Sequence, residues 1–175
     1  MDHLRLVIFD VDGTLVDSQT HIYASMDHAF RALGLSPPSL PQVLAIVGLS
    51  LPEAVAQLAP DLSLADQARI VTVYKTSFAK MRAAEIAPLY PGARETVERL
   101  AARPEVILGL ATGKSRRGLE HVLTAHGLWD HFVTKQVADD HPSKPNPSML
   151  HTAMSETGID AASAVMIGDT SFDME

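Results

Sequence analysis

Short apolar runs alternate with longer stretches of helical periodicity along most of the chain. Residues 4–9, 105–111 and 164–167 form apolar runs, and each run is followed by polar residues and a glycine. Apolar runs of this length are typical of buried strands in a parallel sheet. A further short strand is expected at 132–137.

Between the first two strands, and again after the second, apolar residues recur every three or four positions, which predicts helices. Ile22, Met26 and Phe30 follow this spacing in the first helix. Ser18 or Thr20 is suited to cap its start. Helices are expected at 18–33, 63–85, 92–103, 115–126 and 147–157, with short apolar stretches at 43–47 and 53–58.

The order of these elements predicts how the chain is divided. Strands that alternate with helices imply parallel βαβ units with right-handed crossovers. Residues 18–87 interrupt this alternation after the first strand, because the whole stretch has helical patterning. We therefore expect an α/β fold with a Rossmann-like parallel sheet built from residues 1–17 and 88–175, and an inserted all-helical domain at 18–87.

Composition narrows the range of functions. The 175 residues include 14 Lys and Arg against 21 Asp and Glu, and the net charge of −7 argues against nucleic-acid binding. The chain has no Cys, which excludes thiolate nucleophiles, disulfides and zinc–thiolate sites. No apolar run approaches the roughly 18–20 residues of a membrane span. We expect a cytoplasmic protein without membrane partners, either a monomer or a weak dimer.

Chemically useful side chains follow three of the predicted strands. The carboxyl ends of strands in an open α/β sheet form the crevice where ligands bind, so the fold is expected to gather these residues in one cleft. The residues at these three strand ends are Asp10, Asp12, Gly13, Thr112, Gly113, Asp169 and Asp173.

Such a cleft suits phosphoryl transfer. Several carboxylates close together are unfavourable unless one is protonated or a cation lies among them, and hard oxygen ligands favour Mg²⁺. Gly13 and Gly113 allow backbone N–H groups to face an anion. Thr112 adds a hydroxyl donor, and Lys144, in the proline-rich loop 141–147, adds a positive charge. In phosphoryl transfer a protein mainly positions groups and neutralises charge.

Four segments, DVDGTLVDS, ATGKS, SKPNP and GDTSFD, occur in this order and together span most of the sequence. They resemble the four motifs of the haloacid dehalogenase (HAD) superfamily. The resemblance is closest to the phosphoglycolate-phosphatase-like branch, which has a helical cap inserted after the first motif. It implies a Mg²⁺-dependent phosphatase that hydrolyses a small phosphorylated metabolite, such as phosphoglycolate or a sugar phosphate, through an aspartyl-phosphate.

The same resemblance implies roles for the acidic residues. Asp10 would be the nucleophile and a Mg²⁺ ligand. Asp12 would protonate the leaving oxygen and then deprotonate the attacking water, while its backbone carbonyl reaches Mg²⁺. Asp169 would be the Mg²⁺ ligand from the last strand.

The resemblance also implies a phosphate-binding set. Thr112 and Gly113 would hold the transferring phosphoryl group, and the backbone N–H of Gly13, which the residues themselves suggest as an anion donor, is expected to join them. Lys144 would stabilise the charge between the phosphate and Asp10. Asp173 is expected to hold a metal ligand or Lys144 rather than the ion itself.

Two further segments have a less defined role in the sequence. The basic run 114–117 is expected to be a solvated helix start rather than a phosphate contact. Residues 46–55 combine a glycine and a proline with apolar turns. In related capped enzymes this region faces the active site and shapes substrate choice, and simple helix packing is the alternative.

Other activities of the same superfamily would differ at single positions. A dehalogenase or a phosphonatase would lack the second carboxylate of the first motif, whereas Asp12 is present here. A phosphomutase would typically carry an acidic residue where this chain has Gly168. Nucleotides or pyrophosphate are alternative substrates.

A non-catalytic fragment or binding module is the alternative from another class. Relatives usually continue beyond the position that corresponds to Glu175, so we expect the C-terminal part of the α/β core to be missing from this sequence. The strand at 164–167 would then be an exposed apolar edge, which is an aggregation liability.

Overall fold

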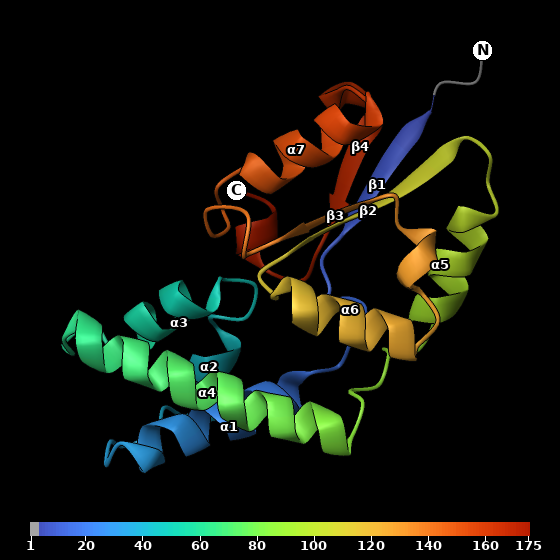
Figure 1. Ribbon diagram of the computed structural model, residues 1–175. Coiled ribbons are helices and arrows are strands. Elements are labelled where there is room, and N and C mark those ends of the chain that lie inside the picture. The colour runs from blue at the N-terminus through green and yellow to red at the C-terminus, as the bar shows by residue number, and fades with distance from the viewer. Residues whose placement is uncertain (1–3) are drawn as a thin grey trace.

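The computed structural model describes residues 4–175 and contains a four-stranded parallel sheet with the strand order β3-β2-β1-β4 (Figure 1). The expected α/β fold with a parallel sheet is confirmed. Residues 1–3, which belong to the expected first core segment 1–17, lie outside the described residues.

The elements follow the sequence pattern closely. The strands are β1 (Arg5–Phe9), β2 (Val106–Thr112), β3 (Thr134–Val137) and β4 (Ala164–Ile167). The helices are α1 (Gln19–Ala32), α2 (Leu40–Leu44), α3 (Leu51–Leu58), α4 (Leu64–Ala84), α5 (Ala93–Ala101), α6 (Arg116–Ala125) and α7 (Ser148–Thr157). Three short 3-10 helices are η1 (Trp129–His131), η2 (Ala161–Ser163) and η3 (Ser171–Asp173). Within residues 4–175, no helix has both the length and the apolar character that a membrane crossing requires.

Helix α2 is short. It begins at Leu40 and ends at Leu44, and the apolar stretch expected at 43–47 continues beyond its end. Ser39 and Gln42 cap its start reciprocally, and the Ser39 backbone N–H donates to Gln42 Oε1 at 2.8 Å. Pro41 lies in the first turn, where its missing N–H costs nothing. These local contacts fix the position at which α2 begins.

The side chains of β1 alternate between two hydrophobic clusters. Val7 and Phe9 pack in one cluster with residues of α5 and α6, and Leu6 and Ile8 pack in another with residues of α7. Since successive side chains of a strand point to opposite faces, helices cover both faces of the sheet. β1 has β2 and β4 as neighbours, so its carboxyl end is fixed from both sides.

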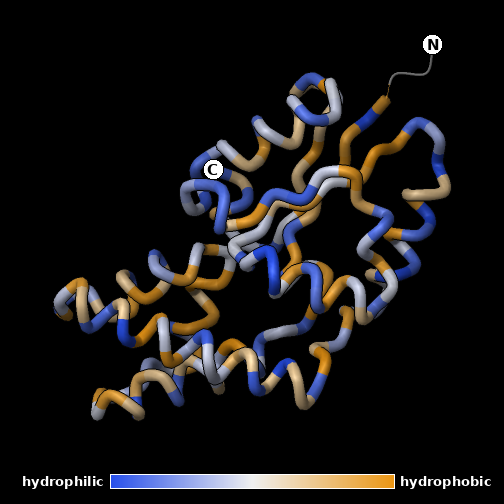
Figure 2. Tube along the Cα trace, viewed as in Figure 1, coloured by the Kyte–Doolittle hydropathy of each residue, from blue (hydrophilic) through white to orange (hydrophobic). Residues whose placement is uncertain are grey.

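Helices α1–α4 (residues 19–84), called here the helical block, have a hydrophobic cluster of their own. Helix α1 packs along α4, and Met26, Phe30 and Ile70 are buried between the helices (Figures 1 and 2). All members of this cluster lie between residues 22 and 78, and orange segments recur along these helices in Figure 2. The helical block therefore buries its apolar surface largely without help from the sheet.

The two connections between the helical block and the sheet lie side by side. The backbone N–H of Asp17 donates to the Pro88 carbonyl at 2.8 Å, and that of Tyr90 donates to the Leu15 carbonyl at 3.0 Å. An antiparallel bridge also joins Val16 and Leu89. The chain thus leaves the sheet and returns to it at one place.

β4 is an edge strand of the sheet. Within residues 4–175 it pairs only with β1, and the side chains of Val165 and Ile167 are 50% and 37% exposed. The strand at 164–167 therefore has the exposed apolar edge that the sequence suggested.

Leu110→Ala is expected to lower the free energy of unfolding by about 2–5 kcal/mol, because Leu110 is fully buried in β2 and its loss leaves a cavity. Leu64→Ala is the matched control, since Leu64 is 84% exposed at the start of α4. Chemical denaturation measures both. An equal loss of stability in the two variants would contradict the packing described here.

Candidate active site

The carboxyl edge of the sheet brings together polar residues that are far apart in the sequence. Asp10 directly follows β1, Thr112 ends β2, and Asp169 lies two residues beyond β4. The Asp10 backbone N–H donates to the carbonyl of Ile167 at 2.8 Å, which ties the end of β1 to the end of β4. The parallel pairing of these strands therefore positions the candidate residues.

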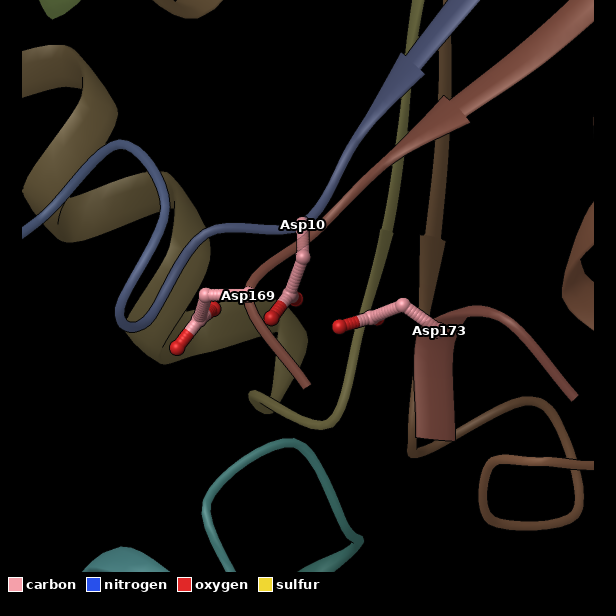
Figure 3. A group of neighbouring side chains, drawn as sticks. All are labelled: Asp10, Asp169 and Asp173. Atoms are coloured by element: carbon pink, nitrogen blue, oxygen red, sulfur yellow. The ribbon is translucent and has the colours of Figure 1, made fainter. Parts of the chain in front are cut away.

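Three carboxylates form a cluster at this edge. Asp10, Asp169 and Asp173 each place a carboxylate oxygen within 4.8 Å of the other two (Figure 3). Asp10 is fully buried, and neither of its side-chain oxygens has a hydrogen-bond partner among residues 4–175. Burial raises the pKa of Asp10 to about 6; Lys144 opposes this shift, while Asp173 and Asp12 add to it.

This cluster fits a hard divalent cation. Buried carboxylate oxygens without a hydrogen bond are costly, and a bound cation would satisfy them. Of the expected metal ligands, Asp10 and Asp169 belong to the cluster, and Asp173 joins them. The carboxylate of Asp12 is engaged with Lys114 and Ser18. If Asp12 contributes to the metal site as expected, the ligand would therefore be its backbone carbonyl oxygen.

A buried lysine neutralises part of this charge. The Lys144 ammonium lies 3.0 Å from Asp10 Oδ1 and 2.5 Å from Asp173 Oδ1. Asp173 also accepts hydrogen bonds from the backbone and the side chain of Thr170, at 3.1 and 2.8 Å. Asp173 therefore holds Lys144 in line with the carboxylate of Asp10.

The loop that carries Lys144 is held at its base by His141. One ring nitrogen of His141 lies 2.8 Å from Gln136 Oε1, and the other lies 2.9 Å from Ser148 Oγ. Because Gln136 belongs to β3 and Ser148 begins α7, the imidazole links the loop to both elements. The rigid base fixes the direction in which Lys144 enters the site.

Asp12 has a separate set of partners. Lys114 Nζ donates to its two carboxylate oxygens at 2.8 and 2.9 Å, and Ser18 Oγ donates to Oδ1 at 2.5 Å. The expectation that Lys114 is part of a solvated helix start is wrong, because its side chain is only 9% exposed. Ser18 precedes α1, but its hydroxyl binds Asp12 instead of capping the helix.

The position of Lys114 before α6 explains its role. The Ser115 hydroxyl accepts from the Gly118 backbone N–H and so begins α6, which leaves Lys114 in the loop at the carboxyl edge of β2. The Thr112 hydroxyl accepts the Lys114 backbone N–H at 3.2 Å, and its own hydrogen is left to donate. The sequence contains a signal for this placement of Lys114: the order of a strand, Thr-Gly-Lys and a helix-capping serine puts the lysine before the helix.

Two glycines allow close backbone approach. At Gly13, where φ is +93°, a Cβ would collide with the Asp169 carboxylate. At Gly113 a Cβ would collide with the backbone carbonyls of Gly48 and Leu49 in the helical block. The N–H of Gly13 donates to the Val16 carbonyl at 3.0 Å. The expectation that this N–H binds phosphate is therefore corrected: Gly13 makes room for Asp169.

A cavity of about 460 Å³ lies above these residues, between the sheet edge and the helical block. Asp10, Asp12, Thr112 and Gly113 line it from the sheet side. Much of the segment 46–55 lines it from the opposite side, as one of the two interpretations of that segment suggested. The contribution of α4 was not anticipated. Its cavity-lining residues are Tyr74, Lys75, Phe78, Ala79 and Arg82.

The sequence is similar to those of proteins named as phosphatases. The chain is 34% identical to "Probable phosphatase IndB" of Dickeya dadantii, over 97% of this chain and 74% of that protein. It is 31% identical to the phosphoglycolate phosphatase of Vibrio vulnificus, over 98% of this chain and 78% of that enzyme.

Solved structures share the fold. A predicted phosphoglycolate phosphatase from Haemophilus somnus aligns with a TM-score of 0.86 and 23% identity, over 97% of this chain and 79% of that chain. β-Phosphoglucomutase from Clostridium difficile aligns with a TM-score of 0.84 and 17% identity, over 97% and 78% of the two chains. Residues 7–175 match the model of a family described as haloacid dehalogenase-like hydrolase. Together with the relative that is 34% identical, this match shows that the chain belongs to the haloacid dehalogenase-like hydrolase family.

Proposed function

We propose that this protein is a Mg²⁺-dependent phosphatase that hydrolyses a small phosphomonoester through an aspartyl-phosphate on Asp10. One observation carries the proposal: the buried carboxylate of Asp10 has no hydrogen-bond partner among residues 4–175 and lines a cavity beside Lys144. The relatives named as a probable phosphatase and a phosphoglycolate phosphatase support the same reaction class.

The first half-reaction transfers the phosphoryl group to the enzyme. A carboxylate oxygen of Asp10 attacks phosphorus, and the bond between phosphorus and the leaving oxygen breaks. Asp12, in its acid form, gives its proton to the leaving oxygen, so that an alcohol is released. Lys114 stabilises the resulting carboxylate of Asp12, to which it donates two hydrogen bonds.

The second half-reaction regenerates Asp10. The Asp12 carboxylate takes a proton from water, the water oxygen attacks phosphorus, and the bond from phosphorus to Asp10 breaks. Inorganic phosphate leaves. Lys144, 3.0 Å from Asp10 Oδ1, neutralises charge on the phosphoryl group, and the Thr112 hydroxyl donates to it.

The residues that would hold Mg²⁺ are Asp10, Asp169 and the backbone carbonyl of Asp12, with Asp173 close enough to take part. When bound, Mg²⁺ would neutralise the negative charge of these carboxylates and of the phosphate. Asp173 already holds Lys144, so we propose that its main role is to position that lysine.

We also propose that residues 18–87 form a cap over an α/β core of residues 1–17 and 88–175. The separate hydrophobic cluster of α1–α4 supports this division, and so do the paired connections at 15–17 and 88–90. The Ser50 backbone N–H donates to Ser143 Oγ at 2.8 Å, one residue before Lys144. A cap closed through this contact would keep water from the aspartyl-phosphate until product leaves.

Phosphoryl transfer to a second substrate site, as in a phosphomutase, is less well supported. The fold alignment with β-phosphoglucomutase carries no functional weight at 17% identity. At Gly168, where a phosphomutase would have an acidic residue, a Cβ would collide with the Asp173 side chain. The contact between Asp173 and Lys144 therefore leaves no space for that residue.

Asp10→Asn is expected to lower Mg²⁺-dependent hydrolysis of p-nitrophenyl phosphate by about a thousandfold or more, because an amide is a poor nucleophile for phosphorus. The thermal midpoint should stay equal or rise, since the variant removes a buried carboxylate that lies near two others. Turnover and thermal unfolding are measured on the same preparation.

The matched control is Asp27→Asn, which makes the same chemical change at a surface ion pair with Arg31. It should retain the activity of the unchanged protein. Near-normal turnover by Asp10→Asn would show that Asp10 is not the nucleophile.

Mg²⁺ is expected to raise the stability of the chelator-treated protein. A concentration about a hundredfold above the dissociation constant adds about 2.7 kcal/mol to the free energy of unfolding. Asp169→Asn should lose most of this gain, because it removes a carboxylate from the cluster. Thermal unfolding with and without Mg²⁺ measures the effect, and Asp27→Asn again serves as control. An unchanged gain in Asp169→Asn would remove Asp169 from the metal site.

A further inference from the structure

The cavity has a basic side as well as an acidic one. Lys75, Arg82, Lys114 and Arg117 line it, and Lys114 is paired with Asp12. In the part of the chain that the structure describes, Arg82 and Arg117 form no ion pair. Arg82 comes from α4 and Arg117 from the first turn of α6, so two separate segments each bring one arginine to the cavity.

Arg82 is held close against α6. Its Nη1 lies 3.7 Å from the position that a Cβ at residue 118 would take, which places the guanidinium within van der Waals reach of α6 at Gly118. His121, one turn further along α6, contacts the Arg82 backbone carbonyl at 3.3 Å. Burial lowers the pKa of Arg82, and the charge of Arg117 lowers it further. Two neighbouring cations without a carboxylate partner are unfavourable, and an anion between them offsets that cost.

Helix α4 leads from this basic side toward the catalytic side. Tyr74, Phe78 and Arg82 follow one another at intervals of four residues, which places them along one face of the helix. The rings of Tyr74 and Phe78 are stacked, with centroids 5.6 Å apart, and Lys114 Nζ lies 5.1 Å from the Phe78 centroid. The two aromatic rings therefore lie beside Lys114 and on the same face of α4 as Arg82.

We propose that Arg82 and Arg117 form a second anion subsite, which selects phosphomonoesters whose leaving group carries another anionic group, a carboxylate or a phosphate. The short chain between the two anionic groups lies against Tyr74 and Phe78. This inference rests on the proposed function for the placement of the phosphoryl group beside Asp10. The inference adds Arg82 and Arg117 as the residues that determine substrate specificity.

Binding of phosphonates tests the subsite without requiring turnover, because their carbon–phosphorus bond is not an ester. The probes are phosphonopropionate, ethylenediphosphonate and propylphosphonate, of which only the last lacks a second anionic group. Isothermal titration in Mg²⁺ is expected to show that the unchanged protein binds at least one of the first two about tenfold more tightly than propylphosphonate.

Arg82→Gln and Arg117→Gln are each expected to abolish this preference and to leave propylphosphonate binding unchanged within about twofold. Arg116→Gln is the matched control on the same helical turn, because the Arg116 guanidinium is paired with Asp140 at 2.7 Å and does not line the cavity. It should keep the preference. Circular dichroism checks the fold of each variant, and Arg117, which is exposed, offers a variant that does not disturb the packing of α4.

Equal binding of all three phosphonates by the unchanged protein, or no binding of any, overturns the inference. So does a loss in Arg82→Gln and Arg117→Gln that is the same for all three probes. If the preference is present and depends on both arginines while phosphate esters are not hydrolysed, the proposed function fails and the anion subsite stands. If phosphate esters are hydrolysed but the protein shows no such preference, the proposed function stands and the anion subsite fails.

Discussion

The contact between the buried Asp10 carboxylate and the Lys144 ammonium is the interaction on which the rest of the site depends. A buried carboxylate near two others is unfavourable, and Lys144, 3.0 Å away, removes part of that cost. Asp173 holds the lysine, and the loop that carries it is fixed through His141. The position of β1 between β2 and β4 keeps Asp10 in place. In the proposed mechanism, Asp10 would therefore be positioned for attack by its surroundings rather than by hydrogen bonds of its own.

The two parts of the chain contribute differently to the cavity. The sheet edge supplies Asp10, Asp12 and Thr112, whereas the helical block supplies mainly apolar walls, the aromatic face of α4 and Arg82. Contact between the parts is close enough that a Cβ at Gly113 would meet the carbonyls of Gly48 and Leu49. In the proposed enzyme, changes in the helical block would therefore alter the choice of substrate and leave the chemistry at Asp10 unchanged.

The sequence predicts most of the fold and the centre of the site, because both follow from local patterns. Apolar runs mark β1, β2 and β4, and parallel strands bring their carboxyl ends to one edge, so the closeness of Asp10 and Asp169 needs no further information. The roles of Lys114 and Ser18 are set by a partner that tertiary packing brings near, 6 residues away for the Ser18–Asp12 pair and 102 for Lys114–Asp12. From the sequence, a charged residue before a helix such as Lys114 is expected to be solvated, because its pairing with the Asp12 carboxylate is not visible there. Likewise, the Gly13 N–H is expected to bind an anion, because the sequence does not show its hydrogen bond to the Val16 carbonyl.

The charges of the cavity give the proposed substrate one orientation. The cluster of Asp10, Asp169 and Asp173 repels anions unless a cation lies among them, whereas Arg82 and Arg117 attract anions directly. A phosphoryl group with Mg²⁺ satisfies the carboxylate side, and a second anionic group satisfies the arginine side. A substrate bound in the reversed orientation would place its second anionic group beside Asp10. When that group is a carboxylate, no reaction follows, because only the phosphoryl end can react with Asp10. Selection for an anionic leaving group and correct placement of the scissile bond would then come from the same pair of arginines.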